Sequence, residues 1–187
     1  MIMNKTVNTL ILLTAVGLGT GAAHVNHPPT SHAPLLRSDA AKKTASLSLV
    51  AGSDQSNAGL NFNGKHGEQS TLTVPLGWTV ELHYRNAGTM PHSVVVVEAP
   101  SKGMAQKLPL KFSEASAAFT GAHSKNVTGG MGRTVPTEMV RFTANKAGDY
   151  LIACGVTGHA MGGQYLKLHV NVQARVATLT EVPVTKL

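Results

Sequence analysis

Alternating apolar and polar positions dominate the middle of the chain and predict β-strands. In residues 78–85 (WTVELHYR) every second side chain is apolar, which is the period of a strand with one face in a core. This alternation predicts that Trp78 is buried and that His83 lies on the solvent face, where it is not a metal ligand. Residues 94–97 (VVVV) are apolar on both faces, as in a strand buried inside a sandwich.

Further strands are indicated by β-branched and aromatic residues bounded by Gly, Pro and Asn. The sequence predicts them at residues 46–51, 60–63, 71–74, 137–143, 150–152 and 165–172. Together with the two segments above, these predict an all-β sandwich of about seven to eight strands. Residues 99–136 interrupt the pattern with scattered Gly and Pro, and we expect one long inserted loop with a helical turn or two at SEASAAF.

The two ends of the chain differ from this central β region. Residues 1–23 combine a positive charge, an apolar run and small residues, which predicts a signal peptide or a membrane anchor. Residues 24–44 contain several prolines and no apolar periodicity, which predicts a flexible linker. The folded domain is expected to span residues 45–173, followed by a C-terminal tail at 174–187.

Composition and charge limit the classes of function. Hydrophobic residues make up 42% of the chain and aromatic residues only 4%, so the core must rest on Val, Leu, Ile and Ala. The formal net charge is +7, but no basic run with interleaved aromatic residues is present, which argues against nucleic-acid binding. A mildly basic surface suits an acidic redox partner, and the scarcity of carboxylates suits an acidic exterior.

The only cysteine lies in a Gly-rich loop between two predicted strands. Cys154 is followed by His159 and then Gln164, with four residues between each pair. A lone buried cysteine is more often a small packed hydrophobe than a ligand. However, residues 86–97 (NAGTMPHSVVVV) place His92 after a turn and next to an apolar strand. Two imidazoles and one thiolate are the equatorial donors of a blue-copper site, and these three residues supply them.

These paired motifs, N-A-G-x-x-P-H-S before a valine run and C-x4-H further on, resemble those of the cupredoxins. The segments LNFNGKHGEQSTLTVPLGWTVELHYRN and IACGVTGHA resemble sulfocyanin most and rusticyanin next. The resemblance covers residues 60–172. It implies a Greek-key cupredoxin sandwich and one type 1 copper ion with His92, Cys154 and His159 as equatorial ligands.

The resemblance also implies roles for neighbouring residues. Ser93, next to the first ligand, would tie its strand to the cysteine loop, although it also suits an ordinary strand start; Asn86 would support the same region. Sulfocyanins and rusticyanins place an axial Met five residues after the loop histidine, whereas this chain has Gln164 there, as stellacyanin-like proteins do. Met161 and an open axial position are the alternatives. An amide oxygen favours Cu(II) more than a thioether does, which predicts a lower reduction potential.

The expected function is outer-sphere transfer of single electrons. His159 would be the half-exposed ligand through which electrons pass, with Met161, Val156 and Met90 forming a weak apolar docking patch. Expected partners are redox proteins such as a c-type cytochrome or a terminal oxidase. The expected location is the periplasm or the outer face of the cytoplasmic membrane, with membrane association through the N-terminal segment.

Three alternatives remain open at this stage. A copper enzyme of the nitrite-reductase or nitrosocyanin type would need an open coordination site or a second metal. A copper carrier would need chelating stretches, and the nearest candidate is the cluster His24, His27 and His32. An adhesive, metal-free sandwich would have Cys154 as a packing residue only.

Overall fold

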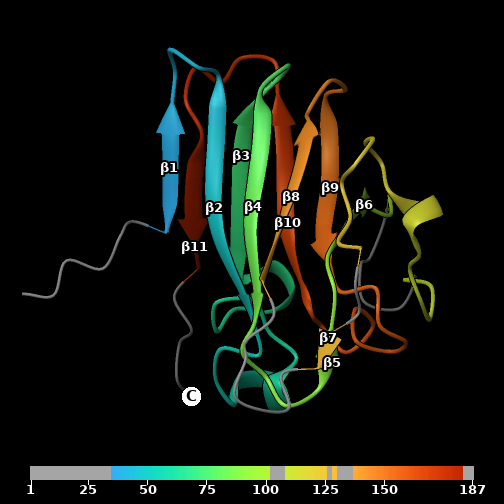
Figure 1. The fold of residues 1–187 in the computed structure, drawn as a ribbon. Helices are drawn as coiled ribbons and strands as arrows, with labels where there is room; N and C mark the ends of the chain where they lie inside the picture. The colour runs from blue at the N-terminus through green and yellow to red at the C-terminus, as the bar shows by residue number, and fades with distance from the viewer. Residues whose placement is uncertain (1–34, 102–107, 126–127, 130–136, 183–187) are drawn as a thin grey trace, which may run out of the picture. The chain divides into compact units, whose positions relative to one another are not determined.

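The computed structural model of the chain describes residues 35–101, 108–125, 128–129 and 137–182 (Figure 1). The predicted leader, residues 1–23, and the first part of the predicted linker lie outside these ranges. Within the described residues, no helix has the length and apolar character needed to span a membrane.

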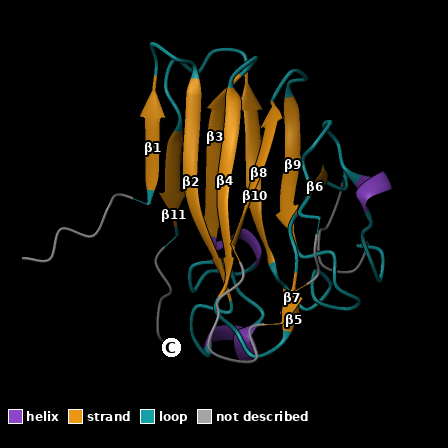
Figure 2. Cartoon of the chain, in the orientation of Figure 1, coloured by secondary structure: helices purple, strands orange, loops and turns teal. Residues whose placement is uncertain are grey.

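Strands dominate the described part of the chain (Figure 2). One sheet has four strands in the order β1 (Leu36–Asp39), β2 (Thr44–Ala51), β4 (Thr79–Asn86) and β8 (Thr137–Thr143). The other has five in the order β11 (Thr178–Glu181), β3 (Ser70–Pro75), β10 (Tyr165–Asn171), β9 (Gly148–Ala153) and β6 (Val95–Glu98). A separate ribbon joins β5 (Pro91–His92) to β7 (Thr128–Gly129). Three short 3-10 turns complete the described elements: η1 (Ser56–Gly59), η2 (Gly67–Gln69) and η3 (Glu114–Ser116).

The core lies between the two large sheets. Along β4 the side chains at positions 80, 82 and 84 are buried, while His83 is exposed, which confirms the predicted alternation. Trp78 just before the strand is also buried. The facing sheet and the residue just before β6 contribute buried aliphatic side chains: Leu72, Val74, Val94, Val96, Ile152, Leu166, Leu168 and Val170. The all-β sandwich is confirmed, and the described residues form nine strands in its two large sheets, where about seven to eight were expected.

Two expectations about the domain limits are wrong. Leu36–Asp39 was expected to belong to the linker, but it forms β1, which pairs antiparallel with β2. Thr178–Glu181 was expected to belong to the tail, but it forms β11, which pairs with β3. Both are edge strands of only four residues, which is too short for an alternation of apolar and polar side chains to be recognised in the sequence. They are stabilised by hydrogen bonds to a neighbouring strand, which the local sequence does not show. Residues 60–63 also form no strand, and only Phe62 makes isolated bridges.

The inserted segment, residues 99–136, is more ordered than a simple loop in its described part. Its backbone covers the edge of β6, because the Val96 amide donates to the Ala122 carbonyl and the Val96 carbonyl accepts from the Ala118 amide, both over 2.8 Å. Phe119 lies in the core, with ring centroids 5.2 Å from Phe142 and 4.7 Å from Tyr150. The Ala-rich piece makes a single 3-10 turn, η3. The insertion therefore protects a sheet edge as well as connecting strands.

Candidate metal centre

Three side chains from separate parts of the chain meet at one end of the sandwich. His92 ends β5, Cys154 directly follows β9, and His159 lies in the loop after it. One nitrogen from each imidazole and the Cys154 sulfur all lie within 4.8 Å of one another. The sulfur is 3.6 Å from Nδ1 of His159, and the two ring centroids are 5.1 Å apart. The three predicted equatorial ligands are therefore brought together.

The register of β9 and β10 positions the cysteine side of the site. Ala153 pairs with Tyr165, so the next pair along the ribbon is Cys154 and Gln164, and the Cys154 amide donates to the Gln164 carbonyl over 3.0 Å. The intervening loop is closed by the backbone N–H of Gln164, which donates to the His159 carbonyl over 2.9 Å. This tight turn brings the imidazole back over the sulfur.

His92 is fully buried, and its surroundings leave it little freedom. A methyl group added at Gly52 or Gly88 would lie 3.2 or 3.0 Å from its Nε2, so the ring packs against bare backbone on that side. The turn before it is held by Asn86, whose side chain accepts from the Gly88 amide and donates to the Met90 carbonyl, both over 3.0 Å. The Asn86 side chain thus holds the turn that leads into His92.

Ser93 links the two halves of the site. Its hydroxyl oxygen accepts a hydrogen bond from the Gly155 amide over 3.0 Å, and both residues are buried. A side chain added at Gly155 would lie 2.9 Å from this hydroxyl oxygen and from the Phe112 carbonyl. The close approach joins the strand of His92 to the loop of Cys154, which is the contact that the resemblance implied for Ser93.

The two candidate axial residues occupy different environments. Gln164 is fully buried, and its Oε1 lies 2.9 Å from Nδ1 of His92 and 3.1 Å from Nδ1 of His159. Met161 is 44% exposed. Two imidazole nitrogens, a thiol sulfur and an amide oxygen therefore converge, and this donor set fits a type 1 copper ion.

Burial sets the protonation of these groups. The pKa of His92 is lowered to about 4, first because burial disfavours the imidazolium and second because of the nearby charge of His159, while the Gln164 hydrogen bond opposes the shift. Burial also lowers the pKa of His159 and raises that of the Cys154 thiol. Neutral imidazoles are ready to ligate, whereas the thiol must release its proton when a metal binds.

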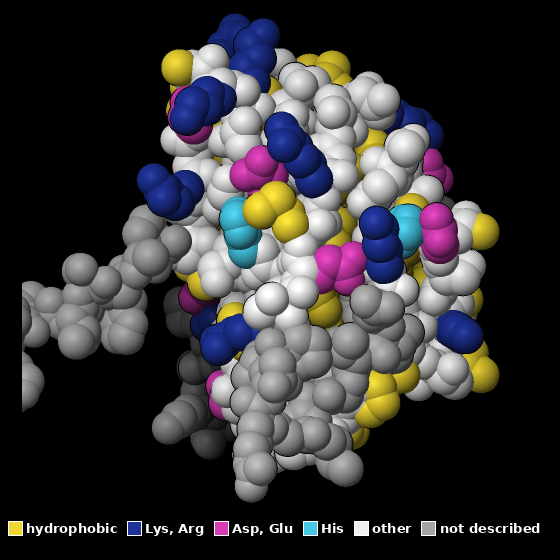
Figure 3. Space-filling model, viewed as in Figure 1, with side chains coloured by type: hydrophobic (Ala, Val, Ile, Leu, Met, Phe, Trp, Pro, Cys, Tyr) yellow, Lys and Arg dark blue, Asp and Glu magenta, His cyan; other side chains and the backbone are white. Residues whose placement is uncertain are grey.

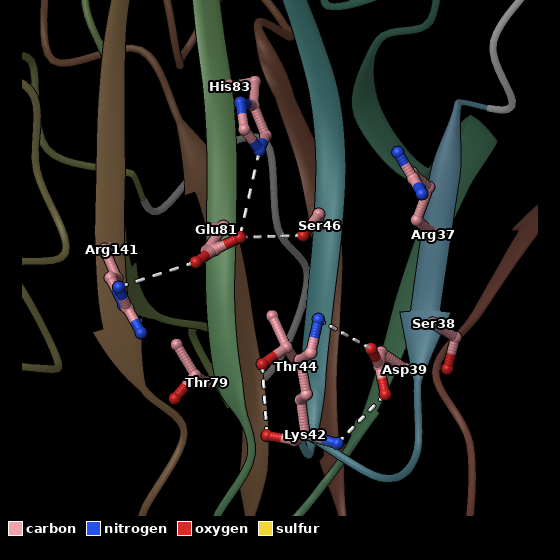
Figure 4. Close-up of a pocket in the computed structure, with 10 residues that line it drawn as sticks. All are labelled: Arg37, Ser38, Asp39, Lys42, Thr44, Ser46, Thr79, Glu81, His83 and Arg141. Carbon is pink, nitrogen blue, oxygen red and sulfur yellow. Dashed lines mark hydrogen bonds and ion pairs between the residues drawn. The ribbon is translucent and has the colours of Figure 1, made fainter.

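Other conspicuous polar residues lie away from this centre. His83 lines a polar groove on the outer face of the sheet that contains β4, where its Nε2 is 3.9 Å from a Glu81 oxygen (Figure 4). Arg141 and Ser46 also contact that carboxylate. His123, in the insertion, pairs with Glu114 over 3.1 Å.

The sequence did not indicate that the loop at residues 53–64 packs against the metal-binding loop, residues 154–164. The Asn61 carbonyl accepts from Nε2 of Gln164 over 3.1 Å, and the Asn57 side chain donates to the Gly162 carbonyl over 2.8 Å. Several asparagines and two glycines within residues 53–64 indicate a turn, but they do not indicate which distant residues the turn contacts.

Comparison with known proteins identifies the family of this chain. Residues 30–180 match the family model of the sulfocyanin (SoxE) domain. Sulfocyanin of Sulfolobus acidocaldarius is 28% identical over 127 residues, which cover 67% of this chain and 63% of that protein, so the match spans less than two thirds of the relative.

Several solved structures have a similar fold. They include reduced auracyanin of Roseiflexus castenholzii, with 22% identity and a TM-score of 0.47 over 67% of this chain and 96% of that one. Rusticyanin of Thiobacillus ferrooxidans has 17% identity and a TM-score of 0.41 over 73% and 97%. Since the family model covers well over half of the chain, the protein belongs to the sulfocyanin family of cupredoxins, whose cofactor is one type 1 copper ion.

Proposed function

We propose that this protein carries single electrons by outer-sphere transfer between respiratory partners at an exported location. The observation that carries the proposal is the convergence of His92, Cys154 and His159 at one end of the sandwich, with all three ligand atoms within 4.8 Å of one another. Such a donor set is the equatorial set of blue-copper electron-transfer sites.

The surrounding fold supports fast electron transfer by limiting rearrangement. Copper, when bound, supplies the change between Cu(I) and Cu(II). His92 and Cys154 are fully buried and lie at the ends of hydrogen-bonded strands, and Ser93 joins their two segments. Gln164 is buried beside both imidazoles and is the proposed axial ligand. Because these groups are held by packing, the protein resists movement when the charge of the site changes.

His159 is the proposed route for electrons into and out of the site. It is partly exposed, whereas His92 is fully buried. The docking patch predicted around it gains a residue from the insertion: Leu110 is 61% exposed, and its carbonyl accepts from the Gly158 amide over 2.7 Å. With Met161, 44% exposed, it gives the patch two accessible apolar side chains. A small patch suits transient redox encounters.

The proposed partners are a c-type cytochrome or a terminal oxidase with an acidic docking face. The net charge of +7 supports this choice, because opposite charge raises the rate of encounter. The apolar, positively charged start of the chain supports export to the periplasm or the outer face of the cytoplasmic membrane, with membrane association through the N-terminal segment.

The first experiment tests the copper site. Optical and EPR spectra of the copper-loaded protein should show the intense visible band and narrow copper hyperfine splitting of a thiolate-bound Cu(II), and both should disappear on reduction. Cys154→Ser should lose the visible band while keeping the fold, as judged by circular dichroism. A wild-type protein that stays colourless with copper would overturn the proposal.

The second experiment tests the route through the docking patch. Leu110→Glu should slow the bimolecular reaction with a reduced cytochrome c, measured by stopped-flow absorbance, without changing the visible spectrum. Met139→Glu is the matched control, because Met139 is also exposed, at 51%, but lies on β8, where it pairs with His83 of β4. Equal rates for the two variants would show that electrons use another surface.

A further inference from the structure

The buried amide of Gln164 is held from two sides. Its Oε1 faces Nδ1 of both imidazoles at 2.9 and 3.1 Å, while its Nε2 donates to the Asn61 carbonyl over 3.1 Å. We infer that the loop at residues 53–64, organised by Asn61, orients this amide with its oxygen toward the metal ligands and thereby sets the reduction potential. The inference rests on the proposed copper function and assigns Asn61 as a positioning residue.

The hydrogen-bond pattern allows only one orientation of the amide. If the Gln164 amide were flipped, its oxygen would face the Asn61 carbonyl oxygen at about the 3.1 Å now spanned by the hydrogen bond. The Asn61 carbonyl would keep its hydrogen bond from the Gly52 amide, but the buried Gln164 oxygen would face an acceptor and lack a donor there. An unsatisfied buried acceptor costs roughly 1–3 kcal/mol. The Asn61 carbonyl is therefore the contact that selects oxygen over nitrogen as the group presented to the metal.

The Asn61 carbonyl is itself firmly placed. Asn61 is fully buried, and its carbonyl also accepts from the Gly52 amide over 3.0 Å. Its side-chain oxygen accepts from the Ser53 amide, the Ser53 hydroxyl and the Gly64 amide, over 3.2, 3.1 and 3.2 Å. Its side-chain nitrogen donates to Asp54 and to the Ser56 carbonyl, the latter over 2.8 Å. Both polar atoms of the Asn61 side chain are therefore hydrogen-bonded within the loop at residues 53–64, and these bonds hold the Asn61 carbonyl in place.

A second contact joins the same loop to the residues before Gln164. Nδ2 of Asn57 donates to the Leu60 and Gly162 carbonyls, both over 2.8 Å. Asn57 and Ala58 have φ values of 49° and 53°, a left-handed conformation that costs a non-glycine residue free energy. Such a conformation persists only where surrounding contacts determine it, so the loop is built to a fixed shape against the metal-binding loop.

The consequence is that the Asn61 carbonyl fixes the direction of the Gln164 oxygen, which is the proposed axial donor. An amide oxygen at this position stabilises Cu(II) more than a thioether does, but only if the oxygen stays directed at the site. Loosening the Asn61 carbonyl should let the amide rotate or withdraw, which would weaken the axial donor and raise the reduction potential.

The test compares two asparagines of the same loop. Asn61→Ala removes the side chain that fixes the carbonyl. Asn63→Ala is the matched control, because Asn63 also bonds backbone groups, Val50 at 2.8 Å and Ser48 at 2.9 Å, but neither leads to Gln164. We expect Asn61→Ala to raise the reduction potential and alter the EPR spectrum, while Asn63→Ala keeps both at wild-type values. Equal shifts in the two variants would overturn the inference.

A double-mutant cycle separates positioning from general loosening. In a Gln164→Met background, the side chain has no amide to orient, so Asn61→Ala should shift the potential much less than in the wild type. The same shift in both backgrounds would contradict a role through Gln164. If Asn61→Ala does not fold, Ser53→Ala removes one hydrogen bond to Asn61 and should give a smaller shift in the same direction. No shift would then overturn the inference.

A measurement on the metal-free protein distinguishes this inference from the copper function. Proton exchange of the Gln164 side-chain amide, followed by NMR, should be slow in the wild type and in Asn63→Ala but faster in Asn61→Ala. Slow exchange in all three proteins would overturn the inference even if the copper spectrum is blue. A colourless protein with the expected exchange pattern would instead reject the proposed function alone.

Discussion

At the scale of single residues, the choice between Gln164 and Met161 decides the chemistry of the site. The Gln164 oxygen lies about 3 Å from both imidazoles, whereas the Met161 side chain is 44% exposed. Axial ligand identity is one of the main influences on the reduction potential of blue-copper sites. Substituting Gln164 should therefore change the reduction potential, whereas substituting Met161 should not.

Gln164→Met should raise the reduction potential, because a thioether stabilises Cu(II) less than an amide oxygen does. Met161→Ala should leave the potential and the EPR spectrum unchanged. Cyclic voltammetry and EPR of the copper-loaded variants measure both effects. If only Met161→Ala changed them, Met161 would be the axial ligand.

Gly52 is a second residue whose identity matters, because it lies against the buried face of His92. Its φ is 58°, and an added Cβ would lie 2.6 Å from the Gly88 Cα. Gly52→Ala should therefore lower the free energy of unfolding of the metal-free protein by about 1–3 kcal/mol more than Gly77→Ala does. Gly77 is the control, since its φ of 81° brings the same strain but, among the described residues other than its two chain neighbours, no atom lies within 4 Å of an added Cβ. Urea denaturation gives the difference, and equal losses would show that the close approach is unimportant.

At the scale of elements, the insertion is part of the structure that supports the site. Its backbone covers β6, which pairs with β9, the strand that leads into Cys154. Phe119 fixes it to the core by packing between Phe142 and Tyr150. The insertion thus stabilises the strand that carries the thiolate, in addition to supplying Leu110 at the surface.

Phe119→Ala should lower the free energy of unfolding by about 3–5 kcal/mol, because it removes a buried aromatic ring and leaves a cavity. Met139→Ala, at an exposed position of β8, should change it by no more than about 0.5 kcal/mol. Denaturant titration of both variants measures the contrast. Similar values for the two would mean that the insertion is only loosely attached.

At the scale of the whole molecule, charge and the metal centre act together. The chain carries a net charge of +7, and on the face seen in Figure 3 the Lys and Arg side chains lie scattered among acidic ones rather than in one patch. A diffuse positive charge attracts anionic partners generally instead of defining a single docking geometry. In the proposed function, the apolar patch around His159 would set the orientation of the partner.

Reduction of the copper-loaded protein by hexacyanoferrate(II), an anion, should slow as ionic strength rises from 0.01 M to 0.1 M. Over this range the Debye length falls from about 30 Å to about 10 Å, which screens the attraction to the protein. Reduction by hexaammineruthenium(II), a cation, is the control and should become faster. Stopped-flow absorbance measures both, and identical trends would show that net charge does not steer the reaction.

The sequence by itself determined the parts of this protein that depend on neighbouring residues. The period of two along β4 and β8 is local, so both strands and their buried faces could be predicted. The ligand types were equally readable, because His92, Cys154 and His159 lie beside turn residues and predicted strands. The order of these motifs was enough to indicate the family.

Only the tertiary structure decided the contacts between distant segments. Asn61 and Gln164 are 103 residues apart. The acceptor is a backbone carbonyl, which every residue has, so the order of side chains does not indicate which carbonyl is used. The edge strands β1 and β11 and the position of Leu110 likewise depend on which neighbours the folded chain supplies. Local sequence sets which groups are available, whereas packing of the two sheets sets which of them meet, because the partners of these hydrogen bonds lie far apart in the sequence and no local pattern specifies them.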